Sequence, residues 1–192
     1  VPIRKAAELL GIANFVFFSP EDLGIIKNGP AERRRFMDME LSQLDKIYLS
    51  NLINYNKVVN QRNKLLKELS FKSSEEKLET LDIWDLQLVK YGTEVMKRRV
   101  GFVQELNELT IEYQPCVEET TFLDTVTKMR ERDLRMKSTC FGPHKDDLIF
   151  FINGSEVKKY GSQGQQRTAA LSLKRAEIEL VKKVVKDTPV LL

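Results

Sequence analysis

The chain has 192 residues, of which 42% are hydrophobic and 31% charged, a balance typical of a globular protein and unlike that of a disordered one. A net charge of +3 does not by itself establish nucleic-acid binding, so any basic surface has to be local. Cys116, Cys140 and the single histidine, His144, lack metal-ligand spacing, so we expect no metal site and reduced cysteines in the cytoplasm. Since no apolar run reaches ~20 residues, we also expect no membrane span.

The first part of the chain predicts a buried strand over residues 12–18, followed by a turn over 19–22. Gly29-Pro30 then favours the start of a helix, because proline suits the first helical turn. That helix carries Arg33, Arg34 and Arg35. These arginines could contact DNA phosphates, or they could form ion pairs with acidic residues on the helix surface.

Two long apolar seams follow, with residues spaced by three or four, which is the period of a helix. Ser73 and Glu76 between them fit a capping box, so the pattern favours an antiparallel helical hairpin. Two core helices of an ordinary bundle would give the same pattern. An arginine takes one position in each seam. The apolar residues of the first seam are Tyr48, Leu52, Tyr55, Val59, Leu66 and Leu69, and those of the second seam are Leu81, Trp84, Leu88, Tyr91, Val95 and Phe102.

The remaining elements mix strands and helices. Alternation over 109–113 predicts a strand, and residues 118–136 favour one amphipathic helix with Met129 on its inner side. Residues 147–152 predict another strand, joined by a tight turn at Asn153-Gly154 to a returning strand over 157–160. We therefore expect an α/β fold in which a helical arm interrupts a layer of strands and helices.

Two polar segments could carry chemistry. In the first, His144 lies beside Lys145 and Asp146, a set that could meet a phosphate or transfer protons. A tight turn whose aspartates accept backbone N–H groups is the alternative. Two further basic groups, at 97–99 and 130–137, could bind DNA phosphates or pair with nearby acids.

The second segment, residues 161–167, runs directly into a long amphipathic stretch. A helix beginning near Ser162 would direct free N–H groups and the positive end of its dipole at a ligand, and Gly164 would permit close approach. This is the local chemistry of a phosphate site, although most capped helices bind nothing. Because the 192 residues contain no phosphate loop, we expect no complete catalytic site and no unaided ATP hydrolysis.

Four motifs occur in the order found in the RecF family, which is related to the SMC/Rad50 ATPase heads: Phe18-Ser-Pro-Glu-Asp-Leu23, Pro30-Ala-Glu-Arg-Arg-Arg-Phe36, Gly142-Pro-His-Lys-Asp-Asp-Leu148 and Gly161-Ser-Gln-Gly-Gln-Gln-Arg167. The chain resembles this family over almost its whole length. The resemblance implies part of an ABC-type P-loop ATPase head over 1–44 and 138–192, with a mostly helical second lobe over 45–137. Walker A and Walker B would lie outside these residues, and the chain is shorter than the family pattern between Arg99 and Leu109.

The resemblance also implies roles for individual residues. Ser162, Gly164 and Gln165 match the signature motif, which would contact the γ-phosphate of ATP held by a second protomer. Arg167 would support the same turn. Glu21 and Asp22 occupy the Q-loop region, where the family's usual glutamine is absent.

The family's function would then follow. A full-length homodimer closed by ATP and Mg²⁺ would bind DNA near single-strand gaps and, with RecR and RecO, help to load RecA. It would act in the bacterial cytoplasm at the nucleoid, and this chain alone would bind no cofactor. A non-enzymatic helical module that binds DNA or a protein is the alternative.

Overall fold

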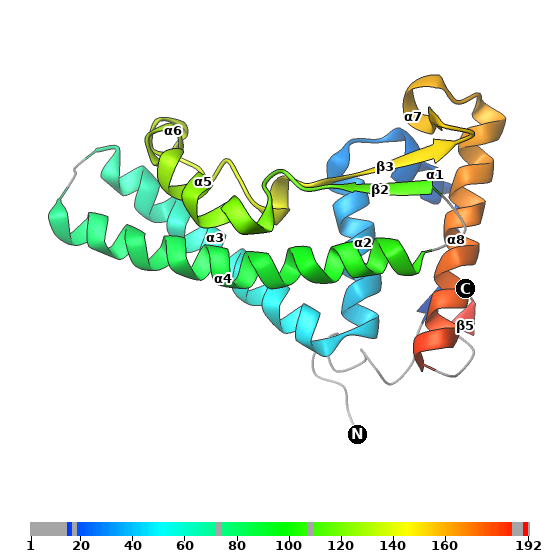
Figure 1. Ribbon diagram of the computed structural model, residues 1–192, viewed down its shortest axis with the longest axis horizontal. Coiled ribbons are helices and arrows are strands. Elements are labelled where there is room, and N and C mark those ends of the chain that lie inside the picture. Colours follow the sequence, from blue (N-terminus) through cyan, green and yellow to red (C-terminus); the bar gives the residue numbers. More distant parts are fainter. Residues whose placement is uncertain (1–14, 17–18, 72–73, 107–109, 186–189, 192) are drawn as a thin grey trace. The chain divides into compact units, whose positions relative to one another are not determined.

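The computed structural model of the chain describes residues 15–16, 19–71, 74–106, 110–185 and 190–191. Two compact units divide the chain, and Figure 1 shows their helices and strands. Unit 1 comprises Val1–Leu49, Arg99–Gln114 and Asp147–Leu192, and unit 2 comprises Ser50–Arg98 and Pro115–Asp146. These divisions differ from the expected boundaries after residues 44 and 137. Residues 99–114 return to unit 1 because their strand pairs there with a strand of the later segment.

Unit 1 contains a small antiparallel sheet, in the order β2 (Thr110–Gln114), β3 (Asp147–Ile152) and β4 (Ser155–Glu156). Ile111 lies opposite Phe150 in this sheet. The predicted turn is confirmed, since Asn153 and Gly154 have φ angles of 50° and 76°, as a two-residue hairpin requires. A second, parallel pair joins β1 (Phe15–Val16) to β5 (Val190–Leu191). The expected α/β class is therefore confirmed.

Helices of unit 1 pack around its longest helix, α8 (Gln163–Val185), which contacts α1 (Leu23–Lys27), α2 (Pro30–Leu44) and strand β3. The start at Pro30 agrees with the prediction. The expected returning strand over 157–160 is wrong, because Val157–Tyr160 forms the short helix α7. Two polar residues between two apolar ones fit one helical turn as well as a strand, and here only Val157 is buried.

Unit 2 is built on the predicted hairpin of α3 (Lys46–Leu69) and α4 (Glu75–Glu105), most of which lies in this unit. Arg62 meets Asp85 across the hairpin, and seven residues earlier Tyr55 lies beside Gly92, so the helices run antiparallel. A Cβ at Gly92 would stand 2.6 Å from the ring of Phe122, which explains a glycine inside an unbroken helix.

The amphipathic helix expected over 118–136 is divided in the structure. It forms a 3-10 turn (Glu119–Thr121), α5 (Phe122–Lys128) and α6 (Arg130–Met136). Met129 joins the last two with φ −93° and ψ 6° and is partly exposed, so its predicted place on the inner side is wrong. Ser73, Leu109 and residues 12–14 and 17–18 of the predicted elements lie outside the described residues.

Candidate functional site

The start of α8 is a reciprocal cap between two exposed residues. Ser162 Oγ accepts a hydrogen bond from the Gln165 N–H at 3.2 Å, and the Ser162 N–H donates to Gln165 Oε1 at 2.7 Å. The sequence Ser-x-x-Gln favours this arrangement because each side chain accepts from a backbone N–H that the helix leaves unpaired. The predicted helix start is thereby confirmed.

This cap directs hydrogen-bond donors outward. Ser162 uses an acceptor lone pair in the cap, so its hydroxyl proton remains for another group, and Gln165 likewise keeps its amide NH₂. A Cβ at Gly164 would meet only Ser162 Oγ, at 3.8 Å, so the fold itself does not require glycine there. Outward donors, the positive end of a 23-residue helix and an open backbone form a set that suits a phosphate group.

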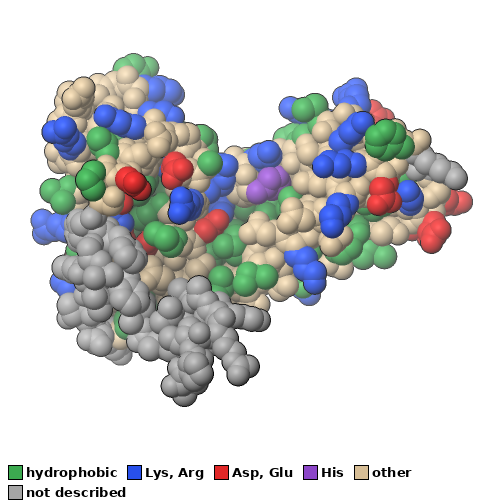
Figure 2. Space-filling view, turned by 180° about the vertical axis from the view of Figure 1, so that it is seen from behind, with side chains coloured by type: hydrophobic (Ala, Val, Ile, Leu, Met, Phe, Trp, Pro, Cys, Tyr) green, Lys and Arg blue, Asp and Glu red, His purple; other side chains and the backbone are tan. Residues whose placement is uncertain are grey.

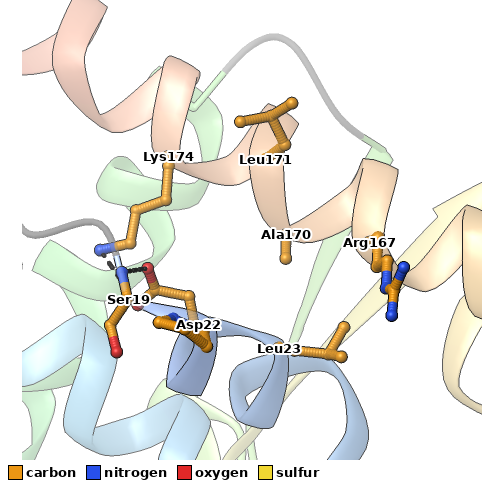
Figure 3. Close-up of a pocket in the computed structure, with 8 residues that line it drawn as sticks. Ser19, Asp22, Leu23, Arg167, Ala170, Leu171 and Lys174 are labelled. Carbon is orange, nitrogen blue, oxygen red and sulfur yellow. Dashed lines mark hydrogen bonds and ion pairs between the residues drawn. The ribbon is translucent and has the colours of Figure 1, made fainter.

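A pocket of about 540 Å³ in unit 1 lies beside the first turns of α8 (Figure 3). Arg167 lies at one end of the labelled set, and at the other Lys174 extends toward Ser19 and Asp22. Asp22 belongs to the 3-10 turn Pro20–Asp22, where its carboxylate accepts from the Ser19 N–H at 2.9 Å. The structure therefore brings two predicted residues, Asp22 and Arg167, to one pocket, whose remaining lining is Pro20, Leu23, Ala170 and Leu171.

Sequence reasoning missed a buried charged cluster behind this pocket. Lys174 Nζ lies 3.0 Å from Glu177 Oε2 and 3.6 Å from Asp22 Oδ1. Burial, and then the charge of Glu177, raise the pKa of Glu40 to about 9. Burial also raises the pKa of Glu177. The available signal was that Lys174 and Glu177 interrupt the apolar stripe of α8.

Known proteins are similar to this chain over its whole length. No family model matches the chain. The DNA replication and repair protein RecF of Lachnospira eligens is 61% identical over 207 positions, covering 100% of this chain and 57% of the relative. RecF of Halalkalibacterium halodurans is 42% identical over 98% of this chain and 57% of the relative. This chain is similar to RecF over its whole length.

Solved RecF structures match the fold as well as the sequence. The recombination mediator protein RecF in the RecFOR pathway, solved as RecF-ATP and as RecF-ATPrS, is 36% identical to this chain. The TM-scores are 0.92 and 0.91, and each match covers 98% of this chain. The chain spans little more than half the length of the RecF proteins that it matches, 56% and 57% for these two structures.

The three candidate residues of the other polar segment, His144, Lys145 and Asp146, lie in unit 2. The ring nitrogens of His144 contact Tyr55 Oη at 2.6 Å and the Thr139 carbonyl oxygen at 3.0 Å. Asp146 is fully buried and accepts from the Cys116 N–H, whereas Lys145 is exposed. The histidine and the aspartate therefore hold the 142–147 turn to its own unit, as the turn interpretation of this motif expects.

The candidate DNA-binding arginines of the RecF-like helix α2 differ in exposure. Arg33 is 3% exposed and paired with Asp147, so its guanidinium group is not available to DNA phosphates in this structure. Arg34 is half-buried and Arg35 exposed. Among the described residues no group of His, Cys, Asp and Glu could hold a metal ion. None of the described helices has the length and apolar character needed to cross a bilayer.

Proposed function

We propose that this chain forms the signature-motif side of a RecF-like ATPase head that acts in DNA repair. One observation supports this most directly: α8 begins at an exposed cap that leaves the Ser162 hydroxyl and the Gln165 amide free to donate. Homology to RecF over the whole chain supports it independently.

In this proposal the donors at the start of α8 would bind the terminal phosphate of an ATP molecule whose remaining contacts, with Mg²⁺, come from a second protomer. ATP, when bound, would supply the phosphate charge that joins the two protomers. The Ser162 hydroxyl and the first-turn N–H groups would neutralise that charge, and Gly164 would let it approach the backbone. Arg167, one turn along α8, would add a positive charge at the pocket (Figure 3).

Closure of such a dimer would couple nucleotide to DNA. We infer that the closed form holds DNA, that RecR and RecO act with it to help load RecA, and that opening of the dimer releases the DNA. The link between Asp22 and Lys174 would carry the state of α8 to the Q-loop-like turn, because it joins those two elements directly. The cytoplasm of a bacterium is the proposed location.

Substitution of Ser162 in a full-length protein that carries this sequence tests the proposal. Ser162→Arg should still bind ATP, because the proposed phosphate loop lies on the other protomer's side of the site. It should not dimerise in sedimentation with ATP, and hydrolysis should fall by at least about tenfold, since one electrostatic donor set is worth that much. Thr168→Arg, also exposed on α8 but past its first turn, is the matched control. Unchanged dimerisation of Ser162→Arg would exclude the signature assignment.

A further inference from the structure

The basic groups that the sequence singled out differ in what their charges contact. In the first group Arg33 is buried against Asp147, and in the second Arg99 is buried against Asp38. Lys97 of the second group lies between two carboxylates, those of Glu94 and Glu119. Much of the charge of these two groups is therefore neutralised within the fold.

In the third group Arg130 is paired with Asp82 and Asp85, but the other cations, on and just after helix α6, are arranged differently. The inner side of α6 is set by Asp133, which accepts from Arg62 at 2.6 Å, and by Leu134, which packs on the leucine cluster of the hairpin. The opposite side consequently faces solvent and presents Arg132, Arg135 and Met136. No ion pair within the described parts of the chain involves Arg132, Arg135 or the following Lys137.

Aromatic rings lie beside two of these cations. Lys137 Nζ stands 4.7 Å from the ring centroid of Phe71, and Arg132 Cζ stands 5.6 Å from that of Phe141. Phe71 is 83% exposed and Met136 is 62% exposed, so neither contributes to the core. Figure 2 shows blue basic side chains along the visible face of unit 2 with green hydrophobic ones between them.

We propose that this surface binds single-stranded DNA, and we call it the α6 face: Phe71, Arg132, Arg135, Met136 and Lys137. Its three cations, against the one exposed carboxylate of α6 at Glu131, suit backbone phosphates. The exposed ring of Phe71 suits an unpaired base, which offers a π-face that a stacked duplex keeps covered. The proposal rests on the proposed function only in taking DNA as the ligand.

Fluorescence anisotropy of the full-length protein with a labelled oligo(dT) of about 20 nucleotides tests the α6 face. Arg132→Gln/Arg135→Gln/Lys137→Gln should weaken binding at least about tenfold at about 50 mM salt. The slope of log affinity against log salt should become shallower by about 2, because each lost phosphate contact contributes ~0.7 for single strands. Phe71→Ala should weaken binding at least about fivefold without changing that slope, because it removes stacking and no charge.

Lys90→Gln/Lys97→Gln/Lys182→Gln is the matched control, since it removes the same charge from other exposed lysines. It should bind oligo(dT) within about twofold of the parent, because it changes the overall charge of the protein and leaves the α6 face intact. Equal loss in both triple variants, or parent-like binding by the α6-face variant, would overturn the proposal. An identical loss for a duplex of the same length would overturn the single-strand assignment. In the proposed function, ATP-dependent dimerisation uses the start of α8 and not the α6 face. Retained dimerisation in these variants would therefore separate this test from that of Ser162.

Discussion

Arg33 and Asp147, 114 residues apart in the chain, form a two-point ion pair, with Nε 2.6 Å from Oδ1 and Nη2 3.0 Å from Oδ2. Arg33 Nη1 also donates to the Asn28 carbonyl oxygen at 2.8 Å. The pair fastens helix α2 to the first residue of β3, so it joins segments that lie on either side of unit 2 in the sequence. A residue that looked like a DNA contact is thus part of the fold of unit 1.

Arg33→Gln should destabilise unit 1. The change leaves the carboxylate of Asp147 and the buried Ile25 carbonyl group without their charged partner, which typically costs about 3 kcal/mol. Urea denaturation followed by circular dichroism would measure the loss. Arg35→Gln, exposed on the same helix, is the control and should change the unfolding free energy by less than ~0.5 kcal/mol. Equal stability of the two variants would contradict the structural role of Arg33.

Gly92→Ala should destabilise unit 2 by about 1–3 kcal/mol, because the added methyl group overlaps packed rings. Its Cβ would lie 2.6 Å from Phe122 Cε1 and 3.0 Å from Tyr55 Cε2. Thermal unfolding would show the effect, and a second variant that adds Phe122→Leu should recover part of it by creating space. If the single variant is as stable as the parent, the inference that Gly92, Phe122 and Tyr55 pack too closely for an added methyl group is wrong.

Gly164→Ala should separate folding from function. In the isolated chain the unfolding free energy should rise by up to ~1 kcal/mol, since alanine is the better helix former and the new Cβ meets only Ser162 Oγ. In the full-length protein the same methyl group would stand where the proposed phosphate approaches, so ATP-dependent dimerisation should weaken at least about tenfold. Sedimentation with and without ATP measures this, and parent-like dimerisation would argue against a phosphate contact at Gly164.

The buried Glu40 should make stability depend on pH. Its pKa is raised by burial from 4.5 to about 9, so between these values the folded state holds a proton that the unfolded state releases. The contribution of this bound proton to the free energy of unfolding is therefore complete below pH 4.5. It is lost as pH rises toward 9, by up to ~1.4 kcal/mol per pH unit.

Glu40→Gln keeps a neutral hydrogen-bonding group at this position, so its unfolding free energy should vary less with pH. The variant should also be more stable than the parent near the alkaline end of that range. Urea denaturation at several pH values checks both statements. Glu75→Gln, an exposed change at the start of α4, should keep the parent's pH dependence. A parallel pH dependence for Glu40→Gln and the parent would show that another group controls it.

Regular patterns in the sequence predicted much of this structure. The start of α2 at Pro30, the hairpin of α3 and α4, strand β3 with its Asn153-Gly154 turn and the cap at Ser162 all follow from local rules of spacing and capping. Local rules did not predict the helix over 157–160, because four residues fit more than one period. They also did not predict the break at Met129, because a helix break depends on what its two halves pack against.

The order of the motifs in the sequence by itself predicted the similarity to RecF, and the period of the apolar residues predicted the amphipathic helices. Only the tertiary structure decided which charged side chains are buried in ion pairs and which are exposed. Arg33 and Arg132 occupy similar basic runs, yet one is buried on a partner 114 residues away while the other points outward beside Phe141. Local sequence cannot encode that difference, because the burial of a charge depends on a partner supplied by a distant segment.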